Sequence, residues 1–280
     1  MIEFEHVSAS YELETPIVRD MSFTINDGEF VAFVGTNGAG KSTTMRLING
    51  LLKPTEGRVL IDGKPTTEMK VSELARNVGF LFQNPDRQIC CKTVREEILF
   101  GLRAQGRLNA ETEARAMGML EDFGLDPDAE PFLLNRGARQ LLALLSIVVP
   151  EPPVLILDEP TTGLDYLECE KVMQTVKRLH EAGTTIIMVC HDMEVVGDFA
   201  KRVIAVTAGH IVGDGPTFEV LRDEAVLKAA ALLPPQIAGI SMALVREFPE
   251  LAGTPIEAAN HTMELAAAVM AYAGKGGEAR

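Results

Sequence analysis

Residues 35–43 read Gly-Thr-Asn-Gly-Ala-Gly-Lys-Ser-Thr, the segment of this sequence best suited to chemistry. It fits the phosphate-binding pattern of glycine, four residues and Gly-Lys-Ser/Thr. Glycines let the backbone turn tightly and direct N–H groups at phosphate oxygens. We expect Lys41 to reach the β- and γ-phosphates of a nucleotide and the Ser42 hydroxyl to bind Mg²⁺. The alternative is a glycine-rich turn that matches by chance, expected in about one chain in a hundred of this length.

The predicted nucleotide-binding residues come from this segment and from one aromatic residue ahead of it: Tyr11, Gly35, Asn37, Gly38, Gly40, Lys41, Ser42 and Thr43. The ring of Tyr11 could stack on a purine base. Half-buried packing in a strand is the alternative for Tyr11. Its place ahead of the glycine-rich segment, in a chain with three tyrosines, favours stacking.

Two carboxylates follow the apolar run at residues 154–157. Asp158 is suited to hold Mg²⁺, directly or through water, and Glu159 to orient or deprotonate an attacking water. His191 follows another apolar run, residues 184–190, and ligands of open α/β sheets bind at the carboxyl ends of strands. We therefore predict that His191 senses a γ-phosphate. The alternatives are a plain loop start for the carboxylates and a polar loop residue for the histidine.

These side chains need an α/β framework to position them. Apolar, β-prone runs predict strands at residues 18–25, 29–34, 59–64, 77–82, 154–158 and 184–190. A helix is predicted at residues 42–49, directly after the phosphate-binding pattern. Helical periodicity at residues 96–104, 110–123 and 139–149 predicts a helical subdomain, at about 84–150, inserted into the α/β core.

The pattern changes again at about residue 216, where helical stretches are interrupted by prolines. Thr254 and Glu257 predict a capping box, with Pro255 at the first helical position. The sequence therefore predicts an ATPase-type domain at residues 1–215 and a helical extension at residues 216–280.

The net charge of −14, without a Lys/Arg-rich run, argues against a large nucleic-acid footprint. It also argues against direct adhesion to anionic lipid, so any route to a membrane goes through a protein partner. The amino terminus predicts no signal peptide. The four cysteines show no CxxC spacing, which predicts a reduced, cytosolic chain. For the adjacent pair Cys90 and Cys91, ordinary packing is favoured over redox activity.

Together these motifs resemble the nucleotide-binding subunit of an ATP-binding cassette (ABC) transporter over about residues 2–215. The resemblance identifies residues 35–43 as Walker A, 155–159 as Walker B, 162–165 as the D-loop, Gln83 as the Q-loop glutamine and His191 as the switch histidine. It implies a P-loop α/β fold of ABC type with an antiparallel β subdomain, and it implies ATP and Mg²⁺ as cofactors. The implied catalytic residues are Glu159, His191, Gln83 and Lys41. The implied Mg²⁺ ligands are Ser42, Gln83 and Asp158.

Residues 82–88, Phe-Gln-Asn-Pro-Asp-Arg-Gln, resemble the Q-loop and short following helix of energy-coupling factor (ECF) ATPases. Those proteins power uptake of vitamins or of cobalt and nickel. The resemblance implies a second ATPase subunit, a transmembrane coupling protein and a substrate-binding membrane protein. It also implies a peripheral position on the cytoplasmic face of the membrane and a dimerising carboxyl-terminal extension. We expect residues 83–88 to dock the membrane subunit.

The family's signature segment, Leu-Ser-Gly-Gly-Gln, corresponds here to Leu-Asn-Arg-Gly-Ala at residues 134–138. In the family this segment closes over ATP held by the other subunit. The changes at Asn135 and Arg136, beside the retained Gly137, therefore put the partner's ATP site in doubt and leave this chain's own site intact. A heterodimer is favoured over a homodimer for this reason.

Two other functions stay open at this point. One is a soluble ABC protein that acts on ribosomes or DNA, against which the single cassette and the acidic charge both count. The other is a structural subunit that binds ATP and hydrolyses it poorly. The intact Walker residues oppose it, and the altered signature segment favours it.

Overall fold

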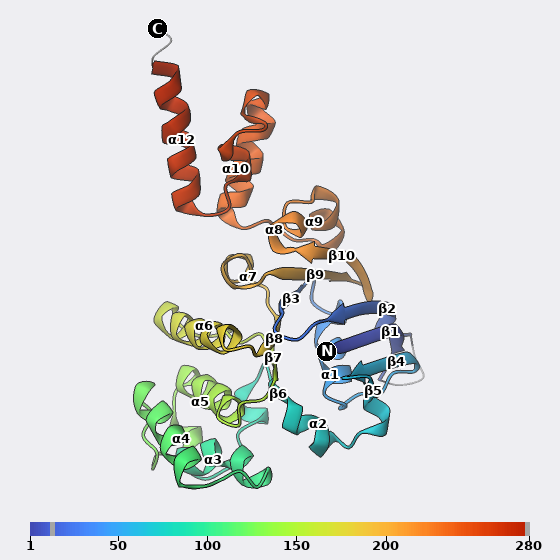
Figure 1. The fold of residues 1–280 in the computed structure, drawn as a ribbon, viewed down its shortest axis with the longest axis vertical. Coiled ribbons are helices and arrows are strands. Elements are labelled where there is room, and N and C mark those ends of the chain that lie inside the picture. Colours follow the sequence, from blue (N-terminus) through green and yellow to red (C-terminus); the bar gives the residue numbers. More distant parts are fainter. Residues whose placement is uncertain (12–14, 278–280) are drawn as a thin grey trace.

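The computed structural model describes residues 1–11 and 15–277, which form two sheets with helices around them (Figure 1). The larger sheet has the strand order β10-β9-β3-β8-β7-β6. Its strands are β3 (Phe30–Val34), β6 (Val78–Leu81), β7 (Val154–Asp158), β8 (Thr185–Val189), β9 (Arg202–Thr207) and β10 (His210–Pro216). All neighbours pair in parallel except β10, which is antiparallel to β9.

The smaller sheet is antiparallel and has the order β2-β1-β4-β5. Its strands are β1 (Ile2–Ala9), β2 (Val18–Ile25), β4 (Glu56–Ile61) and β5 (Lys64–Pro65). Figure 1 shows it on one side of the larger sheet, with helices α5 and α6 on the other side. The predicted α/β fold with an antiparallel β subdomain is therefore confirmed.

Side chains of the central strands alternate between two cores, as the period of a β-strand requires. In β3, Phe30 and Ala32 pack on the helical side, whereas Val31 and Phe33 pack toward the smaller sheet. The helical side is covered by α3 (Val94–Ala104), α4 (Ala110–Asp122), α5 (Arg136–Val148), α6 (Tyr166–Glu181) and α7 (Met193–Phe199). The other core includes α1 (Lys41–Ile48) and α2 (Val71–Asn77). Both faces of the sheet are thus buried, which explains why its strands read as apolar runs.

Two local predictions need correction. Helix α5 begins before the predicted residue 139, because the Asn135 side chain accepts a hydrogen bond from the Ala138 N–H at 2.8 Å and caps the helix. The predicted capping box at Thr254 is wrong. The Thr254 hydroxyl donates to the Leu251 carbonyl, and the Glu257 carboxylate accepts from the Gly253 N–H, so neither side chain caps the helix as a capping box requires.

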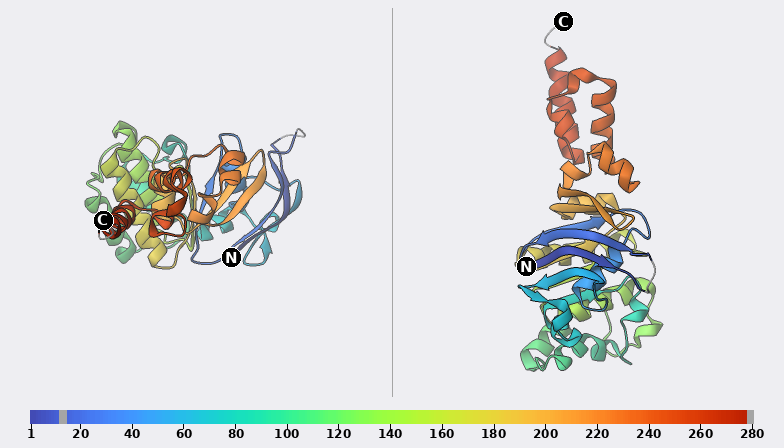
Figure 2. Two further views of the ribbon diagram at one scale, coloured as in Figure 1. Left: turned by 90° about the horizontal axis from the view of Figure 1, so that it is seen from above. Right: turned by 90° about the vertical axis from the view of Figure 1, so that its right-hand side faces the viewer.

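The carboxyl-terminal region contains α8 (Thr217–Val220), α9 (Glu224–Ala230), α10 (Gln236–Glu247), α11 (Pro255–Ala258) and α12 (Thr262–Gly277). Figures 1 and 2 show α10 and α12 side by side, extending away from both sheets. Leu251, Ile256 and Ala268 form a small separate core there. The boundaries predicted at 84–150 and after 215 stay predictions, and residues 278–280 lie outside the described part of the extension.

Within residues 1–11 and 15–277, no helix is both long and apolar enough to cross a bilayer.

Candidate nucleotide-binding site

The glycine-rich segment forms a tight loop between the end of β3 and the start of α1. Gly35 has φ 135°, and a Cβ there would lie 2.0 Å from the carbonyl oxygen of Val206. Gly40 has φ 105°, and a Cβ there would lie 2.9 Å from the carbonyl oxygen of Ile17. Only glycine suits these two positions, because each combines a left-handed backbone with a close neighbouring chain. The loop thereby turns directly into the amino terminus of α1, where N–H groups favour an anion.

Lys41 is 5% exposed and points back into this loop. Its ammonium donates to the carbonyl oxygens of Gly35 at 2.7 Å and Thr36 at 2.8 Å. Burial lowers the pKa of Lys41, and the nearby carboxylates of Glu159 and Asp158 oppose that shift. A phosphate in the loop would favour the ammonium in the same way that these carboxylates do.

Ser42 and Asp158 bring an oxygen pair together from α1 and from the end of β7. The Ser42 hydroxyl donates to Asp158 Oδ1 at 3.1 Å. Burial raises the pKa of Asp158, and the Ser42 hydrogen bond works against that rise. A hydroxyl and a carboxylate are hard oxygen donors of the kind that Mg²⁺ prefers, so this pair fits the predicted magnesium ligands.

Glu159, the residue after β7, is the point where two other predicted catalytic side chains, Gln83 and His191, meet. Its carboxylate accepts from Gln83 Nε2 at 2.8 Å, and His191 Nε2 lies 3.2 Å from its other oxygen. The Thr162 hydroxyl donates to it at 3.0 Å. Its own backbone has φ 53°, held by a bond from its N–H to the Val189 carbonyl at 2.9 Å. A left-handed non-glycine residue that the surrounding structure enforces is typical of functional sites.

The structure separates two roles predicted for Gln83. Its amide hydrogen bond goes to Glu159. Within residues 1–11 and 15–277, it makes no hydrogen bond to Ser42 or Asp158. Its place beside Glu159 fits the predicted catalytic role, and its role as a Mg²⁺ ligand stays a prediction.

Tyr11 lies beside the phosphate-binding loop and is 50% exposed. Its hydroxyl is 3.4 Å from Thr43 Oγ1 and accepts from Arg46 Nη1 at 2.7 Å. The Arg46 guanidinium carbon lies 5.7 Å from the centre of the ring. Arg46 was not predicted as part of the site. Its place one turn after Ser42 on α1 would have suggested it.

Asn37 and Gly38 lie at the turn of the loop, where Gly38 has φ 77°. Asn37 borders an open cleft of about 600 Å³. Gly35 and His191 line the same cleft, opposite the segment that joins α9 to α10. The loop, the residues that follow β8 and the connection between α9 and α10 therefore line one cleft.

The signature segment packs against the D-loop and α6 of the same chain. Asn135 caps α5 through its oxygen, which leaves its amide N–H₂ for other partners. A Cβ at Gly137 would lie 2.1 Å from Glu168 Oε1. The Arg136 side chain lies over Gly163, where a Cβ would be 2.8 Å from Arg136 Nε. The Arg136 side chain, which stands where the family's segment has a glycine, therefore lies against the D-loop.

Comparisons with known proteins agree with this geometry. A profile of the ABC transporter family matches residues 18–162. A putative ABC transporter ATP-binding protein of Caldanaerobacter subterraneus is 40% identical over 89% of this chain and 44% of its own length. This relative and two similar curated proteins are longer than the chain, which spans about two fifths of their length. The energy-coupling factor transporter ATP-binding protein EcfA of Methanothermobacter thermautotrophicus is 36% identical over 86% of this chain and 78% of its own.

Solved structures give the same picture. CbiO1 of Clostridium perfringens, part of the ABC transporter complex cbiONQ, is 28% identical with a TM-score of 0.71, covering 89% of this chain and 96% of that one. A dimeric ATP-binding cassette bound to ADP and Pi is 29% identical with a TM-score of 0.71, covering 78% and 99%.

Proposed function

Because the chain belongs to the ABC transporter family, we propose that it is the ATP-binding and ATP-hydrolysing subunit of a membrane importer of the ECF type. The ABC-type fold expected from the sequence is confirmed by the solved relatives. The observation that carries the proposed activity is the convergence of Gln83, Thr162 and His191 on the Glu159 carboxylate. Similarity to EcfA supports the ECF type, and vitamins or cobalt and nickel ions are the proposed cargo.

Each part of the site has a definite task in hydrolysis. The loop N–H groups and Lys41 bind the phosphates of ATP. Ser42 and Asp158 would hold Mg²⁺, which supplies charge neutralisation on the phosphate oxygens. Glu159 orients a water molecule and accepts its proton as the water oxygen bonds to the γ-phosphorus and ADP leaves. His191 and Gln83 fix the direction of that carboxylate.

A second ATPase subunit is proposed to cover the face that carries the signature segment and the D-loop. Large apolar side chains are exposed on it: Phe132 at 56%, Leu133 at 79%, Tyr166 at 81% and Leu167 at 69%. Exposed apolar groups gathered in one place favour a protein partner. We favour a different chain over a second copy, because two copies would place an altered signature at both ATP sites. The extension at residues 216–280 is proposed to add to this dimer.

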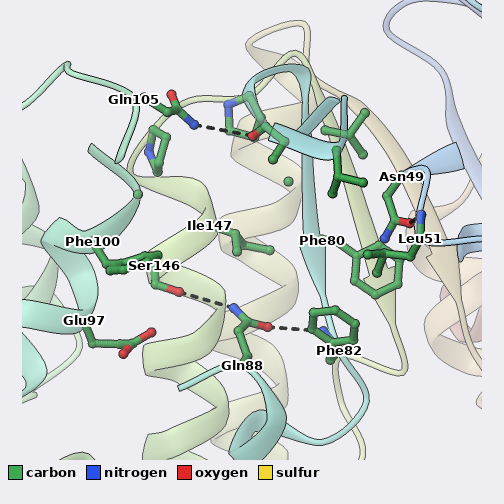
Figure 3. Close-up of a pocket in the computed structure, with 17 residues that line it drawn as sticks. Asn49, Leu51, Phe80, Phe82, Gln88, Glu97, Phe100, Gln105, Ser146 and Ile147 are labelled. Atoms are coloured by element: carbon green, nitrogen blue, oxygen red, sulfur yellow. Dashed lines mark hydrogen bonds between the residues drawn. The ribbon is translucent and has the colours of Figure 1, made fainter. Parts of the chain in front are cut away.

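The transmembrane coupling protein is proposed to dock in the groove of about 350 Å³ shown in Figure 3. Phe80, Phe82 and Phe100 face this groove, between β6 on one side and α3 with α5 on the other. The chain is then held by membrane proteins at the cytoplasmic face of the membrane. The substrate-binding membrane protein would act through the coupling protein.

Two polar residues of the predicted docking segment at residues 83–88 form bonds within the chain. Gln88 accepts from the Phe82 N–H at 3.2 Å and donates to the Ala143 carbonyl at 2.6 Å. Asp86 forms an ion pair with Arg139 at 2.9 Å. We therefore assign docking to the apolar wall of the groove, with Gln88 and Asp86 holding the Q-loop in shape.

Phe100→Asp should reduce co-purification with the coupling protein by about tenfold or more. Phe100 is 51% exposed in the groove, and loss of a central interface residue costs on the order of 2 kcal/mol. The measurement is recovery of the membrane subunits from detergent-solubilised membranes with a tagged chain. Phe100→Leu is the matched control, and ATP binding by both isolated variants should stay unchanged. Normal recovery with Phe100→Asp would remove the groove as the docking site.

Restoring the signature residues should raise hydrolysis at the partner's ATP site. We expect the triple variant Asn135→Ser, Arg136→Gly, Ala138→Gln to increase it by on the order of tenfold, since it returns a donor and a close backbone approach. The test uses an assembled complex with Glu159→Gln, so that the remaining turnover reports the partner's site. The same complex with the partner's catalytic glutamate also replaced gives the background. An unchanged rate would show that the altered segment does not limit that site.

A further inference from the structure

Two neighbouring cysteines and a glutamate form a cluster outside the nucleotide site. Cys90 and Cys91 lie between the short 3₁₀ helix Pro85–Arg87 and α3, and Glu97 lies in the first turns of α3. One ligand atom from each residue lies within 4.8 Å of the other two. Across residues 1–11 and 15–277, no other set of three such side chains, whether His, Cys, Asp or Glu, comes this close.

The backbone holds this cluster in place. The chain bends at Cys91, so that two adjacent thiols lie near the same carboxylate. Glu97 is 3% exposed, and its Oε2 accepts from the N–H groups of Cys90 at 2.9 Å and Cys91 at 2.8 Å. Those two bonds fix the carboxylate against the cysteine pair and leave Oε1 for another ligand. Thr93 caps α3 and so fixes the helix that carries Glu97.

Charge favours a cation at this point. Glu97 is a buried carboxylate whose identified partners are two neutral N–H groups, and buried charges are normally paired or bound to metal. Burial, with the Glu97 carboxylate beside it, raises the pKa of the Cys91 thiol to about 12. Such a thiol is a poor nucleophile, but a metal ion can displace its proton.

We propose that Cys90, Cys91 and Glu97 bind a thiophilic divalent cation such as Zn²⁺, with water as a fourth ligand. Two sulfurs, one carboxylate oxygen and one open position suit tetrahedral Zn²⁺, whereas Mg²⁺ and Ca²⁺ prefer oxygen alone. Binding would release the two thiol protons to solvent. This proposal does not depend on the proposed transport function.

Ordinary packing explains Cys190 better than it explains Cys90. Cys190 is buried and its thiol lies 3.5 Å from the Asp192 carbonyl oxygen. Cys90 is exposed, so it contributes little to a core. The cluster also borders the docking groove, since Glu97 lines it together with Gln88 and Phe100 (Figure 3). A bound ion would tie the segment after the Q-loop to α3.

The test is metal titration of the reduced, chelator-treated full chain. Cd²⁺ binding is monitored by the charge-transfer absorption of the cadmium–thiolate bonds, and Zn²⁺ binding is measured by calorimetry. We expect one ion per chain, and at least a tenfold loss of affinity in Cys90→Ser, Cys91→Ser and Glu97→Gln. Cys169→Ser is the matched control and should bind as the wild type does. Zn²⁺ should also protect Cys90 from a thiol reagent.

Absence of stoichiometric binding by the wild-type chain would overturn the proposal. So would unchanged affinity in the Cys90→Ser, Cys91→Ser double variant. Circular dichroism checks that each variant is folded. The exposed Cys90 can be replaced without disturbing the core, so Cys90→Ser decides the question even if Glu97→Gln is unstable.

Discussion

Glu159→Gln should leave ATP binding close to the wild-type level and lower turnover at this chain's own site by on the order of 10²- to 10⁴-fold. The amide keeps the size of the side chain and cannot accept the proton of the attacking water. In the wild type the Thr162 hydroxyl donates to Glu159. The carbonyl oxygen of the glutamine side chain can still accept that hydrogen bond, so the loop should keep its shape. The measurements are nucleotide affinity of the isolated chain and ATPase rate of the assembled transporter.

The control for Glu159→Gln is Glu181→Gln, the same change at an exposed position at the end of α6. Each subunit of the complex should also carry its own catalytic substitution in turn. Near-normal hydrolysis by Glu159→Gln, with loss of activity in the partner's variant, would reverse our assignment of the strong and weak ATP sites. A small effect of both substitutions would favour the structural-subunit alternative.

The strand-end residues of this site could be predicted because their signals are local. Apolar runs end at residues 34, 157 and 190, and chemically active residues follow each run. In the structure β3, β8 and β7 are neighbours, so these ends meet at one edge. The glycine pattern likewise encodes the loop, because the backbone it requires excludes other residues.

The contacts around Glu159 could not be predicted in the same way. The bonds from Gln83 and Thr162 join segments that are distant or irregular, and no sequence period encodes them. The left-handed backbone of Glu159 is equally hidden, because no glycine marks it. The sequence pattern predicts no helix or strand at residues 166–181, where the structure has α6. This helix buries only Val172, Met173, Thr175 and Val176, which is a weak periodic signal.

The cysteine cluster shows the same limit. Adjacent residues of an extended chain point in opposite directions, so Cys90 and Cys91 suggest no shared ligand. The bend at Cys91 and the hydrogen bonds that the Cys90 and Cys91 N–H groups donate to Glu97 create the arrangement. Asp86 and Gln88 are a parallel case, because their partners Arg139 and Ala143 lie on α5, far along the chain.

Lys41→Ala should act on a different step from Glu159→Gln and weaken ATP binding itself by about 10²-fold or more. Truncating one partner of a buried, hydrogen-bonded charge pair costs on the order of 2–5 kcal/mol. The substitution also removes the two bonds to the Gly35 and Thr36 carbonyls that brace the loop. The measurement is equilibrium binding of ATP with Mg²⁺ to the isolated chain.

Two control variants separate charge from geometry in this prediction. Lys64→Ala removes a lysine of the same charge from the exposed strand β5 and should bind ATP normally. Lys41→Arg keeps the charge but places a wider, planar group at a buried position, since Lys41 is only 5% exposed. We expect Lys41→Arg to bind nearly as poorly as Lys41→Ala. Wild-type affinity in Lys41→Arg would mean that charge alone suffices, and wild-type affinity in Lys41→Ala would show that the loop binds phosphate through its backbone N–H groups without the ammonium.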